Sequence, residues 1–419
     1  MTDTKSTKSN ESPNGTNTSH GTTVGKSAEP ANLRVVQLAD NGALYSYGPV
    51  LRRMAVGLID EVGELSLLCL EVSPMLKHVP SPPVRLIKQT KRYHQPTYYS
   101  NFVSREITIT APRFGLLERL CPLKQAKRIG EILAPYKPTL LHAMSERQAR
   151  LTQHLSQLLD IPYVVSLLSM QNSEVPAFDK RCGRILPCNS YLAREVRRNQ
   201  PELADRIQLL PIGTHVSDQP CCFDHGQRQA QLFCCGRLEY RHGFPELINA
   251  LKRLSDMGYN FNMTLSGHGP AEHNLRRQVN ELNLNQRVHF VPPIEMMLSG
   301  SNAYKAVLRT VDIFIQPWPN IAWRPELLES MSVGNAVVVA NGVKNDLVLE
   351  GKTALTIPFH NEQALTDKVE QLLKDREYAR LLAQRSQTYL RKHFLTSRMI
   401  TRLAKAYREA LLYNKGITK

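Results

Sequence analysis

The chain has 419 residues, enough for two or three domains with sizeable hydrophobic cores. Its composition is ordinary for a globular protein, except that 53 Lys and Arg against 37 Asp and Glu give a formal net charge of +16. This surplus favours anionic partners, among them nucleic acid, acidic glycans, anionic lipid headgroups and nucleotide phosphates.

Residues 1–30 are rich in Ser, Thr, Asn and Gly and contain no Ile, Leu, Phe, Trp or Tyr. Such a segment cannot bury enough apolar surface to offset its ordering entropy, so we expect a disordered tail. It lacks the features of a secretory signal peptide, and no stretch of the chain approaches the roughly 18 apolar residues of a membrane span. We therefore expect a cytoplasmic protein, whose eight cysteines are reduced core residues.

From residue 31 to 215 the pattern alternates short apolar runs with amphipathic ones, which predicts βαβ units and a parallel sheet. Ser190 is placed to cap the N-terminus of a helix over Tyr191–Asn199. The expected strands cover residues 33–39, 65–72, 139–143, 163–168, 184–188 and 207–211.

Residues 216–228 break this rhythm with Gly, Pro, Asp and His, which predicts a linker between two domains. A second alternating series fills 229–395. We predict two doubly wound, Rossmann-like α/β domains facing a central cleft, because open parallel sheets bind ligands at the carboxyl ends of their strands. Strands are expected over residues 232–235, 261–266, 288–291, 312–316, 336–340 and 354–357.

The C-terminal residues 371–419 are expected to form a nearly continuous helix, whose basic last part (396–419) extends beyond the second domain. Twelve Lys and Arg stand against three acidic residues in this segment. A solvated basic helix face is the simpler interpretation. Attachment to the inner face of an anionic membrane is the alternative.

Four polar segments follow expected strands of the second domain in a fixed order. The first is Cys-Gly-Arg-Leu-Glu-Tyr-Arg-His-Gly at 235–243, and the second is Ser-Gly-His-Gly-Pro at 266–270. The third is Arg-Val-His-Phe at 287–290, and the fourth runs from Arg324 to Gly334. Glycines let backbone approach a ligand closely, and a helix N-terminus offers free N–H groups to an anion. Together these segments indicate a phosphate-binding site.

In this order and spacing the chain resembles the family-four, retaining glycosyltransferases of the GT-B fold. The resemblance is strongest from Phe233 to Gly351 and looser in the first half, at residues 141–143, 161–165 and 210–213. It implies a GT-B architecture, an enzyme of the hexosyltransferase type, and a nucleotide-sugar donor bound without a metal ion or other cofactor.

The resemblance also implies roles for particular residues. Arg237 matches the family's arginine on the donor diphosphate, and Glu329 matches the glutamate that holds the donor ribose. Gly267 and Gly269 match the glycine turn beside the nucleotide. The candidate donor-binding residues are Gly236, Arg237, Arg241, His242, Gly267, Gly269, Arg324 and Glu329.

Three positions depart from the family pattern. The family's lysine before the glycine is replaced by Arg241-His242-Gly243, the first signature glutamate falls at Ile321, and the usual histidine of the first domain falls near Leu168. The last two changes affect the sugar-reacting end of the site rather than the nucleotide end.

Arg237 and Glu326 are the candidate catalytic residues. Glu326 shares a helix face with Glu329 and could replace the missing carboxylate. Alternatively, Glu326 only complements the helix dipole after Pro325 at the first helical position. Arg324, at the same helix start, could clamp phosphate or lie in solvent.

The acceptor side is expected to include Tyr45, Tyr47 and Gly48, in the loop after the first strand that the resemblance places beside the phosphates and acceptor. Residues 77–99 combine seven basic side chains with tyrosines and prolines. They could bind nucleic acid by stacking and charge, or an anionic lipid-linked acceptor, but an exposed basic loop is the simpler interpretation.

The sequence thus predicts a glycosyltransferase that moves a sugar from a nucleotide-sugar donor to a glycan or lipid-linked acceptor, with retention of configuration. The alternative is an inactive GT-B protein that binds a sugar nucleotide or a partner. Nucleic acid is not favoured, because only the charge supports it and no nucleic-acid-binding module is recognised.

Overall fold

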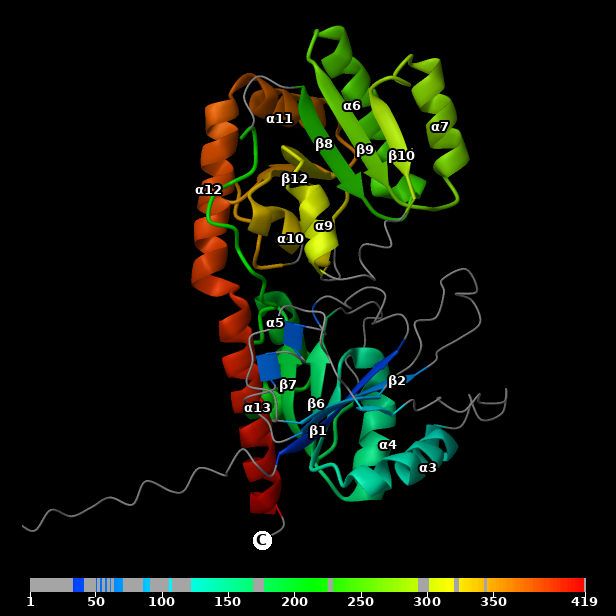
Figure 1. The fold of residues 1–419 in the computed structure, drawn as a ribbon, viewed down its shortest axis with the longest axis vertical. Helices are drawn as coiled ribbons and strands as arrows, with labels where there is room; N and C mark the ends of the chain where they lie inside the picture. The colour runs from blue at the N-terminus through cyan, green and yellow to red at the C-terminus, as the bar shows by residue number, and fades with distance from the viewer. Residues whose placement is uncertain are drawn as a thin grey trace, which may run out of the picture.

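The computed structural model describes residues 33–40, 50, 53–54, 57–58, 61, 64–70, 86–90, 105–107, 122–168, 177–224, 229–292, 301–319, 324–342 and 345–417. Two α/β domains, each built on its own sheet, lie one above the other along the long axis (Figure 1). This arrangement confirms the predicted fold class.

The N-terminal sheet has seven strands in the order β4-β3-β2-β1-β5-β6-β7. The five strands from β2 to β7 in this order run parallel, as the alternating pattern predicts. Their bounds are β1 (Arg34–Asp40), β2 (Glu64–Leu70), β5 (Leu140–Ala143), β6 (Tyr163–Leu167) and β7 (Cys182–Pro187). The described helices of this domain are α3 (Pro122–Leu133), α4 (Ala149–Leu159) and α5 (Ser190–Asn199).

Two further strands, β3 (Leu86–Thr90) and β4 (Arg105–Ile107), extend one edge of this sheet antiparallel to their neighbours. The expectation of an exposed loop over residues 77–99 is therefore wrong for its middle part. Leu-Ile-Lys-Gln-Thr is short and only partly alternating, and the prolines before it favour a loop, so local pattern alone does not reveal the pairing.

The expected strand over residues 207–211 is also wrong. Gln208 and Leu210 donate backbone hydrogen bonds to the carbonyls of Ile185 and Pro187, both at 2.9 Å. Pro187 has no N–H to donate in return, so the segment runs beside β7 without completing a ladder.

The N-terminus of α5 also differs from expectation. Asn189 is the capping residue, because its side chain accepts a hydrogen bond from the Leu192 backbone N–H at 2.8 Å. Ser190 is already helical, and its hydroxyl contacts the Asp346 carboxylate at 2.5 Å. Ser190 therefore contacts the C-terminal domain instead of capping the helix.

The C-terminal sheet is entirely parallel, with the order β10-β9-β8-β11-β12-β13. Every one of these strands overlaps an expected one. Their bounds are β8 (Ala230–Cys235), β9 (Phe261–Ser266), β10 (Val288–Val291), β11 (Ile313–Gln316), β12 (Ala336–Ala340) and β13 (Leu355–Ile357). The helices described around them are α6 (Phe244–Asp256), α7 (Glu272–Glu281), α9 (Ser301–Leu308), α10 (Pro325–Val333) and α11 (Glu362–Lys374). Short 3₁₀ turns lie at Ala134–Tyr136, Glu146–Gln148, Pro201–Arg206 and Tyr240–His242.

The C-terminal segment is not one continuous helix. It breaks at Asp375, which caps α12 (Arg376–His393), and again before α13 (Thr396–Ile417). Helix α12 lies along the C-terminal domain, while α13 returns to the N-terminal domain (Figure 1). Leu403, Tyr407 and Ala410 on α13 are fully buried. The last helix is therefore a structural part of the N-terminal domain, with only one face in solvent.

A buried polar network joins α13 to the N-terminal sheet. The imidazole of His142 on β5 lies 2.7 Å from the Tyr407 hydroxyl and 2.9 Å from the Ser166 hydroxyl. Gln37 on β1 donates to the same Tyr407 hydroxyl at 3.1 Å. Burial lowers the pKa of His142 to about 3, so the ring is neutral at pH 7.

This network predicts a pH-dependent stability. Between about pH 6.5 and pH 3, the unfolded chain binds a proton at His142 and the folded chain does not, so stability falls as the pH falls. We expect wild type to lose up to about 1.4 kcal/mol of unfolding free energy per pH unit relative to His142→Gln in this range. Urea unfolding of both proteins at several pH values measures the difference. A gap that is constant with pH would contradict the assignment.

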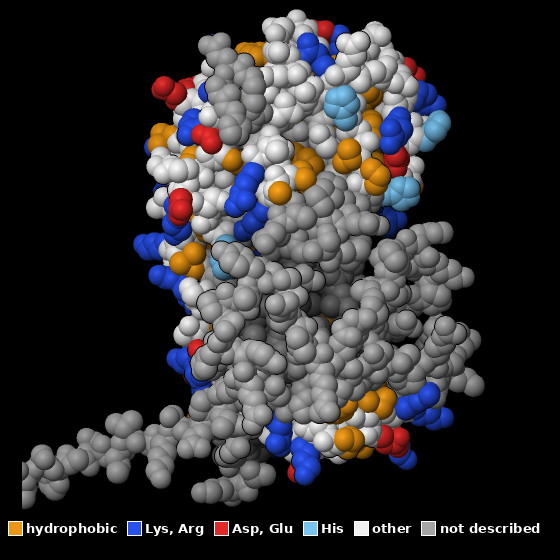
Figure 2. All heavy atoms as spheres, viewed as in Figure 1, with side chains coloured by type: hydrophobic (Ala, Val, Ile, Leu, Met, Phe, Trp, Pro, Cys, Tyr) orange, Lys and Arg blue, Asp and Glu red, His pale blue; other side chains and the backbone are white. Residues whose placement is uncertain are grey.

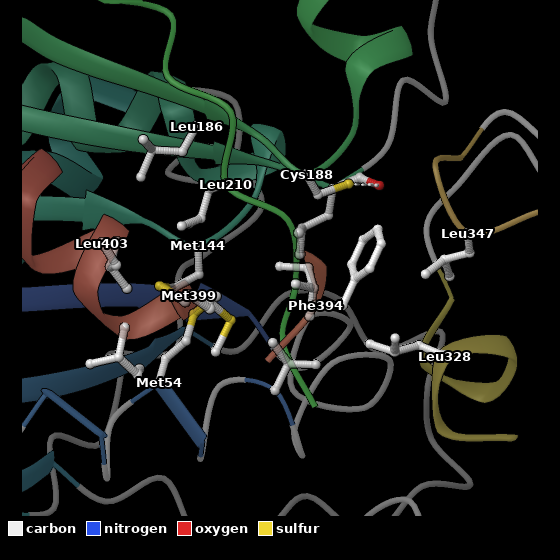
Figure 3. Close-up of a cluster of buried hydrophobic side chains, with 14 of the residues drawn as sticks. Met54, Met144, Leu186, Cys188, Leu210, Leu328, Leu347, Phe394, Met399 and Leu403 are labelled. Carbon is white, nitrogen blue, oxygen red and sulfur yellow. Dashed lines mark hydrogen bonds between the residues drawn. The ribbon is translucent and has the colours of Figure 1, made fainter. Parts of the chain in front are cut away.

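One apolar core spans both domains. Figure 3 shows Met54, Met144 and Met399 grouped on the N-terminal side, with Phe394 lying toward Leu328 of α10. These side chains are all buried and belong to a single cluster. Because this interface is apolar and continuous, it holds α10, the helix of the fourth polar segment, against the N-terminal domain.

Candidate functional site

The loop after β8 carries two of the predicted phosphate-binding arginines. The Arg237 and Arg241 side chains are 67% and 77% exposed, and both pair with the carboxylate of Glu239. The Arg237 contact measures 2.5 Å. Hydrogen bonding from Arg241 lowers the pKa of Glu239, and the charges of Arg241 and Arg237 act in the same direction. Two exposed cations thus share one carboxylate, leaving a net positive loop.

His242 lies at the end of the same loop. Its Nδ1 is 2.7 Å from the Arg237 carbonyl oxygen, and its ring stacks on Trp318 with centroids 5.0 Å apart. Trp318 also limits the space at Gly236, where a Cβ atom would lie 2.8 Å from the indole. His242 therefore helps to shape the loop, and no described contact sets it apart as a catalytic group.

The glycine turn after β9 packs against this loop. A Cβ atom on Gly267 would lie 1.9 Å from the Gly236 carbonyl oxygen, and one on Gly269 would lie 2.3 Å from the Leu238 carbonyl oxygen. Backbone hydrogen bonds join the two loops, including Gly236 N–H to the Ser266 oxygen at 2.9 Å. The structure thus requires glycine at both positions for close packing of the two strand-end loops.

Helix α10 begins where the sequence predicts, with Arg324 as the capping residue and Pro325 at the first helical position. Arg324 is exposed, whereas Glu326 is only 7% exposed and its Oε2 has no hydrogen-bond partner within the described part of the chain. Burial raises the pKa of Glu326, although the Arg324 charge opposes this shift. Burial is the main reason that the pKa values of Cys235 and Tyr304 are raised, and the charge of Glu326 raises both further. Glu326 is therefore a buried carboxyl group near β8 and α9.

Glu329, one helical turn further, is 2% exposed and has partners from three parts of the chain. Arg53, on the helical segment after β1, approaches Oε1 at 2.7 Å. The Lys305 ammonium lies 3.1 Å from Oε2, and the Thr214 hydroxyl donates to the same oxygen at 2.8 Å. Lys305 also donates to Thr214 at 3.0 Å and to the carbonyl of His215. We call Arg53, Thr214, Lys305 and Glu329 the interdomain ion cluster.

This cluster holds two positive charges and one negative charge in a nearly dry environment. Burial alone would raise the pKa of Glu329, but the charges of Arg53 and Lys305 together with its hydrogen bonds lower it, so the carboxylate is ionised. Burial, followed by the Lys305 and Arg53 charges, lowers the pKa of nearby His215. His215 is therefore neutral at pH 7 and adds no third cation.

Three arginines of α12 contact the segment that connects the two sheets. Arg380 donates to the Cys222 carbonyl at 2.9 Å, and Arg391 donates to the carbonyls of Ser217 and Asp218. Arg376 lies 4.8 Å over the Phe223 ring. Other Lys and Arg side chains remain on the surface along the edge that α12 forms (Figure 2). Part of the basic surplus is thus structural.

Several predicted positions lie outside the described residues, namely Tyr45, Tyr47, Gly48 and Ile321. Leu168 is buried at the end of β6. Its polar neighbour Ser166 is engaged with His142 rather than directed to the candidate site. Within the described part of the chain, no three His, Cys, Asp or Glu side chains are arranged to hold a metal ion. None of the helices described has the length and apolarity to cross a bilayer.

Comparisons with known proteins agree with this geometry. Residues 223–389 match the family model for glycosyl transferases group 1. Sucrose-phosphate synthase from Thermosynechococcus elongatus superposes with a TM-score of 0.65 at 17% identity, covering 90% of this chain and 98% of that one. The Anabaena protein HepE, solved with UDP and glucose, superposes with a TM-score of 0.62 at 15% identity, covering 89% and 98%. The chain has the GT-B fold, and its C-terminal half is similar in sequence to glycosyl transferases group 1.

Among curated proteins, the uncharacterized glycosyltransferase YqgM of Bacillus subtilis is 23% identical over 269 residues, which cover 61% of this chain and 74% of YqgM. The matched family segment of this GT-B chain contains the arginine loop, the glycine turn and all of α10. The resemblance to GT-B glycosyltransferases that the four polar segments indicate is thus confirmed.

Sequence reasoning missed Arg53, Lys305 and Thr214, which surround Glu329. It also missed Glu239, which pairs with both loop arginines. None of these residues belongs to a motif, and a lone lysine or arginine on an amphipathic helix normally lies in solvent. The only local signal is the position of Lys305 next to Tyr304, on the buried face of α9.

Proposed function

We propose that this GT-B protein transfers a sugar, with retention of configuration, from a nucleoside-diphosphate sugar to a glycan or lipid-linked acceptor. The single observation that carries the proposal is the pair of strand-end loops at the carboxyl edge of the C-terminal sheet. There Arg237 and Arg241 stand exposed beside the close-packed turn of Gly267 and Gly269. Exposed cations at the carboxyl ends of parallel strands suit a diphosphate.

In this proposal the side chains act by electrostatics. As the sugar leaves, negative charge develops on the diphosphate, and the two arginines together with the N-terminus of α10 stabilise that charge. Glu239 pairs with both guanidinium groups when no donor is bound, and in this proposal the diphosphate displaces it. The fold relative HepE, whose structure contains UDP and glucose, is consistent with such a donor.

The first test is calorimetric binding of UDP, GDP and ADP. We expect at least one to bind, and Arg237→Ala to weaken it about 10- to 100-fold, because a hydrogen bond to a charged group contributes about 1.5–3 kcal/mol. Glu239→Gln is the matched control in the same loop. It removes the competing carboxylate, so binding should not weaken. If none of the three binds near millimolar concentration, both the enzyme and the sugar-nucleotide-binding alternative fail.

Metal independence is a separate prediction. Because arginines and a helix N-terminus neutralise the diphosphate in this proposal, donor binding and turnover should survive chelation with EDTA. The assay compares chelated protein with the same sample after addition of Mg²⁺ or Mn²⁺. Activity that disappears on chelation and returns with metal would contradict the assignment of the site.

Turnover distinguishes an enzyme from a protein that only binds the donor. Glu326, a buried carboxyl group in the first turn of α10, remains the candidate catalytic carboxyl group. Hydrolysis or transfer should be assayed with whichever nucleotide sugar matches the nucleoside diphosphate that binds.

Attachment to anionic lipid through the exposed basic residues of α12 and α13 also stays a prediction, and salt-sensitive sedimentation with anionic vesicles tests it.

A further inference from the structure

The carboxylate of Glu329 cannot contact a ligand in the arrangement that the structure shows. It is 2% exposed, and both of its oxygens face protein partners. The resemblance implies that the same carboxylate holds the donor ribose. A ribose hydroxyl can reach Glu329 only if one of these partners moves away.

The partners differ in the domain that supplies them. Lys305 on α9 belongs to the same domain as Glu329, and α9 packs directly against α10. Arg53 comes from the N-terminal domain and crosses the interface. Any change in the angle between the domains therefore alters the distance from Arg53 to Glu329, but leaves Lys305 in place.

Arg53 is also the less well satisfied partner. Its side chain is 5% exposed, and none of its three guanidinium nitrogens has a hydrogen-bond partner among the described residues, so the 2.7 Å contact of Nη2 with Glu329 is an ion pair without hydrogen-bond geometry. Among the described residues, its polar contact is the ion pair with Glu329 alone. A buried guanidinium group with a single ionic partner costs desolvation energy that one contact offsets incompletely. Lys305, by contrast, has three partners: Glu329, Thr214 and the His215 carbonyl.

We propose that Arg53 is a positioning residue that competes with the donor ribose for the Glu329 carboxylate and thereby couples donor binding to the arrangement of the two domains. This inference rests on the proposed function, since it assumes a nucleotide donor. When the donor binds, ribose hydroxyls take the place of Arg53 beside Glu329 and donate hydrogen bonds to it, while Lys305 keeps the carboxylate ionised. Arg53 then moves with the N-terminal domain.

The test compares two substitutions that remove the same charge from the same carboxylate. Arg53→Met removes the partner across the interface, and Lys305→Met removes the partner within the domain. The probes are the nucleoside diphosphate among UDP, GDP and ADP that wild type binds, together with its 2′-deoxy analogue. Calorimetry gives the two dissociation constants for each protein, and circular dichroism confirms that each is folded.

We expect Arg53→Met to bind the ribonucleotide about fivefold or more tightly than wild type does, at the low end of usual coupling between sites. The gain should be smaller for the 2′-deoxy analogue, because only the ribose hydroxyl contacts Glu329. Lys305→Met should not gain affinity, since Arg53 still occupies the carboxylate. Should Arg53→Met fail to fold, Arg53→Gln serves as the second variant with the same expected result.

Three outcomes would overturn the inference. Equal weakening of both nucleotides by Arg53→Met and Lys305→Met would mean that the two residues act only as positive charges near the diphosphate. A ratio of ribose to deoxyribose affinity that Arg53→Met leaves unchanged would mean that Glu329 never meets the ribose. Both results leave the proposed function intact. Failure of wild type to bind any of the three nucleotides would instead reject the proposed function, and this inference with it.

Discussion

Glu329→Gln is expected to lower the free energy of unfolding by about 3–5 kcal/mol, the cost of leaving a buried charge without its partner. Among the described residues, the carboxylate is the only negative group in contact with Arg53 and Lys305. Glutamine keeps the size and one acceptor oxygen but leaves two buried cations uncompensated. Guanidinium chloride unfolding followed by circular dichroism measures the change.

Arg53→Met and Lys305→Met are the matched controls. Each removes one cation and leaves a neutral pair with Glu329, and replacing a buried charge by an apolar side chain of similar volume is often nearly neutral. We therefore expect both to cost less than Glu329→Gln, although all three change the same cluster. If Glu329→Gln is as stable as either control, the carboxylate does not compensate the two cations.

Gly267→Ala should destabilise the protein by about 1–3 kcal/mol and also weaken nucleoside-diphosphate binding, because the added methyl group overpacks the two loops of the donor site. The new Cβ would lie 1.9 Å from the Gly236 carbonyl oxygen, which is backbone and cannot rotate away. The arginine loop must therefore move. The melting temperature and the calorimetric affinity for the bound nucleoside diphosphate measure the two effects.

His268→Ala controls for a change in the same turn. The His268 side chain is 80% exposed, and its polar contact in the described part of the chain is with Glu272. Its removal leaves the backbone packing intact, so stability should stay within about 0.5 kcal/mol of wild type. Equal effects of Gly267→Ala and His268→Ala on binding would show that loop packing does not place the arginines.

The strands of the C-terminal domain could be predicted from the sequence because each is a short apolar run bounded by polar turns. The run Ala-Val-Val-Val-Ala of β12 is buried at every position, as expected for a strand covered on both faces of a parallel sheet. The Gly-Arg and Gly-His-Gly turns could be located for the same reason, since they directly follow such runs. Their order then indicated the family.

The N-terminal domain was harder to predict. The edge strand β3 lies in a polar, proline-containing region, and it forms only because β2 offers an unpaired edge. The apparent strand at 207–211 fails for a complementary reason, because Pro187 cannot return its hydrogen bonds. Pairing of strands depends on the neighbour as much as on the strand itself.

By itself, then, the sequence determined the two α/β domains, the glycine turns and the positions of Arg237 and Glu329 in their local elements. These depend on apolar periodicity and turn chemistry, which act over a few residues. Only the tertiary structure decided that Glu329 is buried and meets Arg53, Lys305 and Thr214. These residues are far apart in the chain, and their contact exists because an apolar interface brings the two domains together around α10. Neither charge pattern nor periodicity carries information on which distant cation a buried carboxylate will meet.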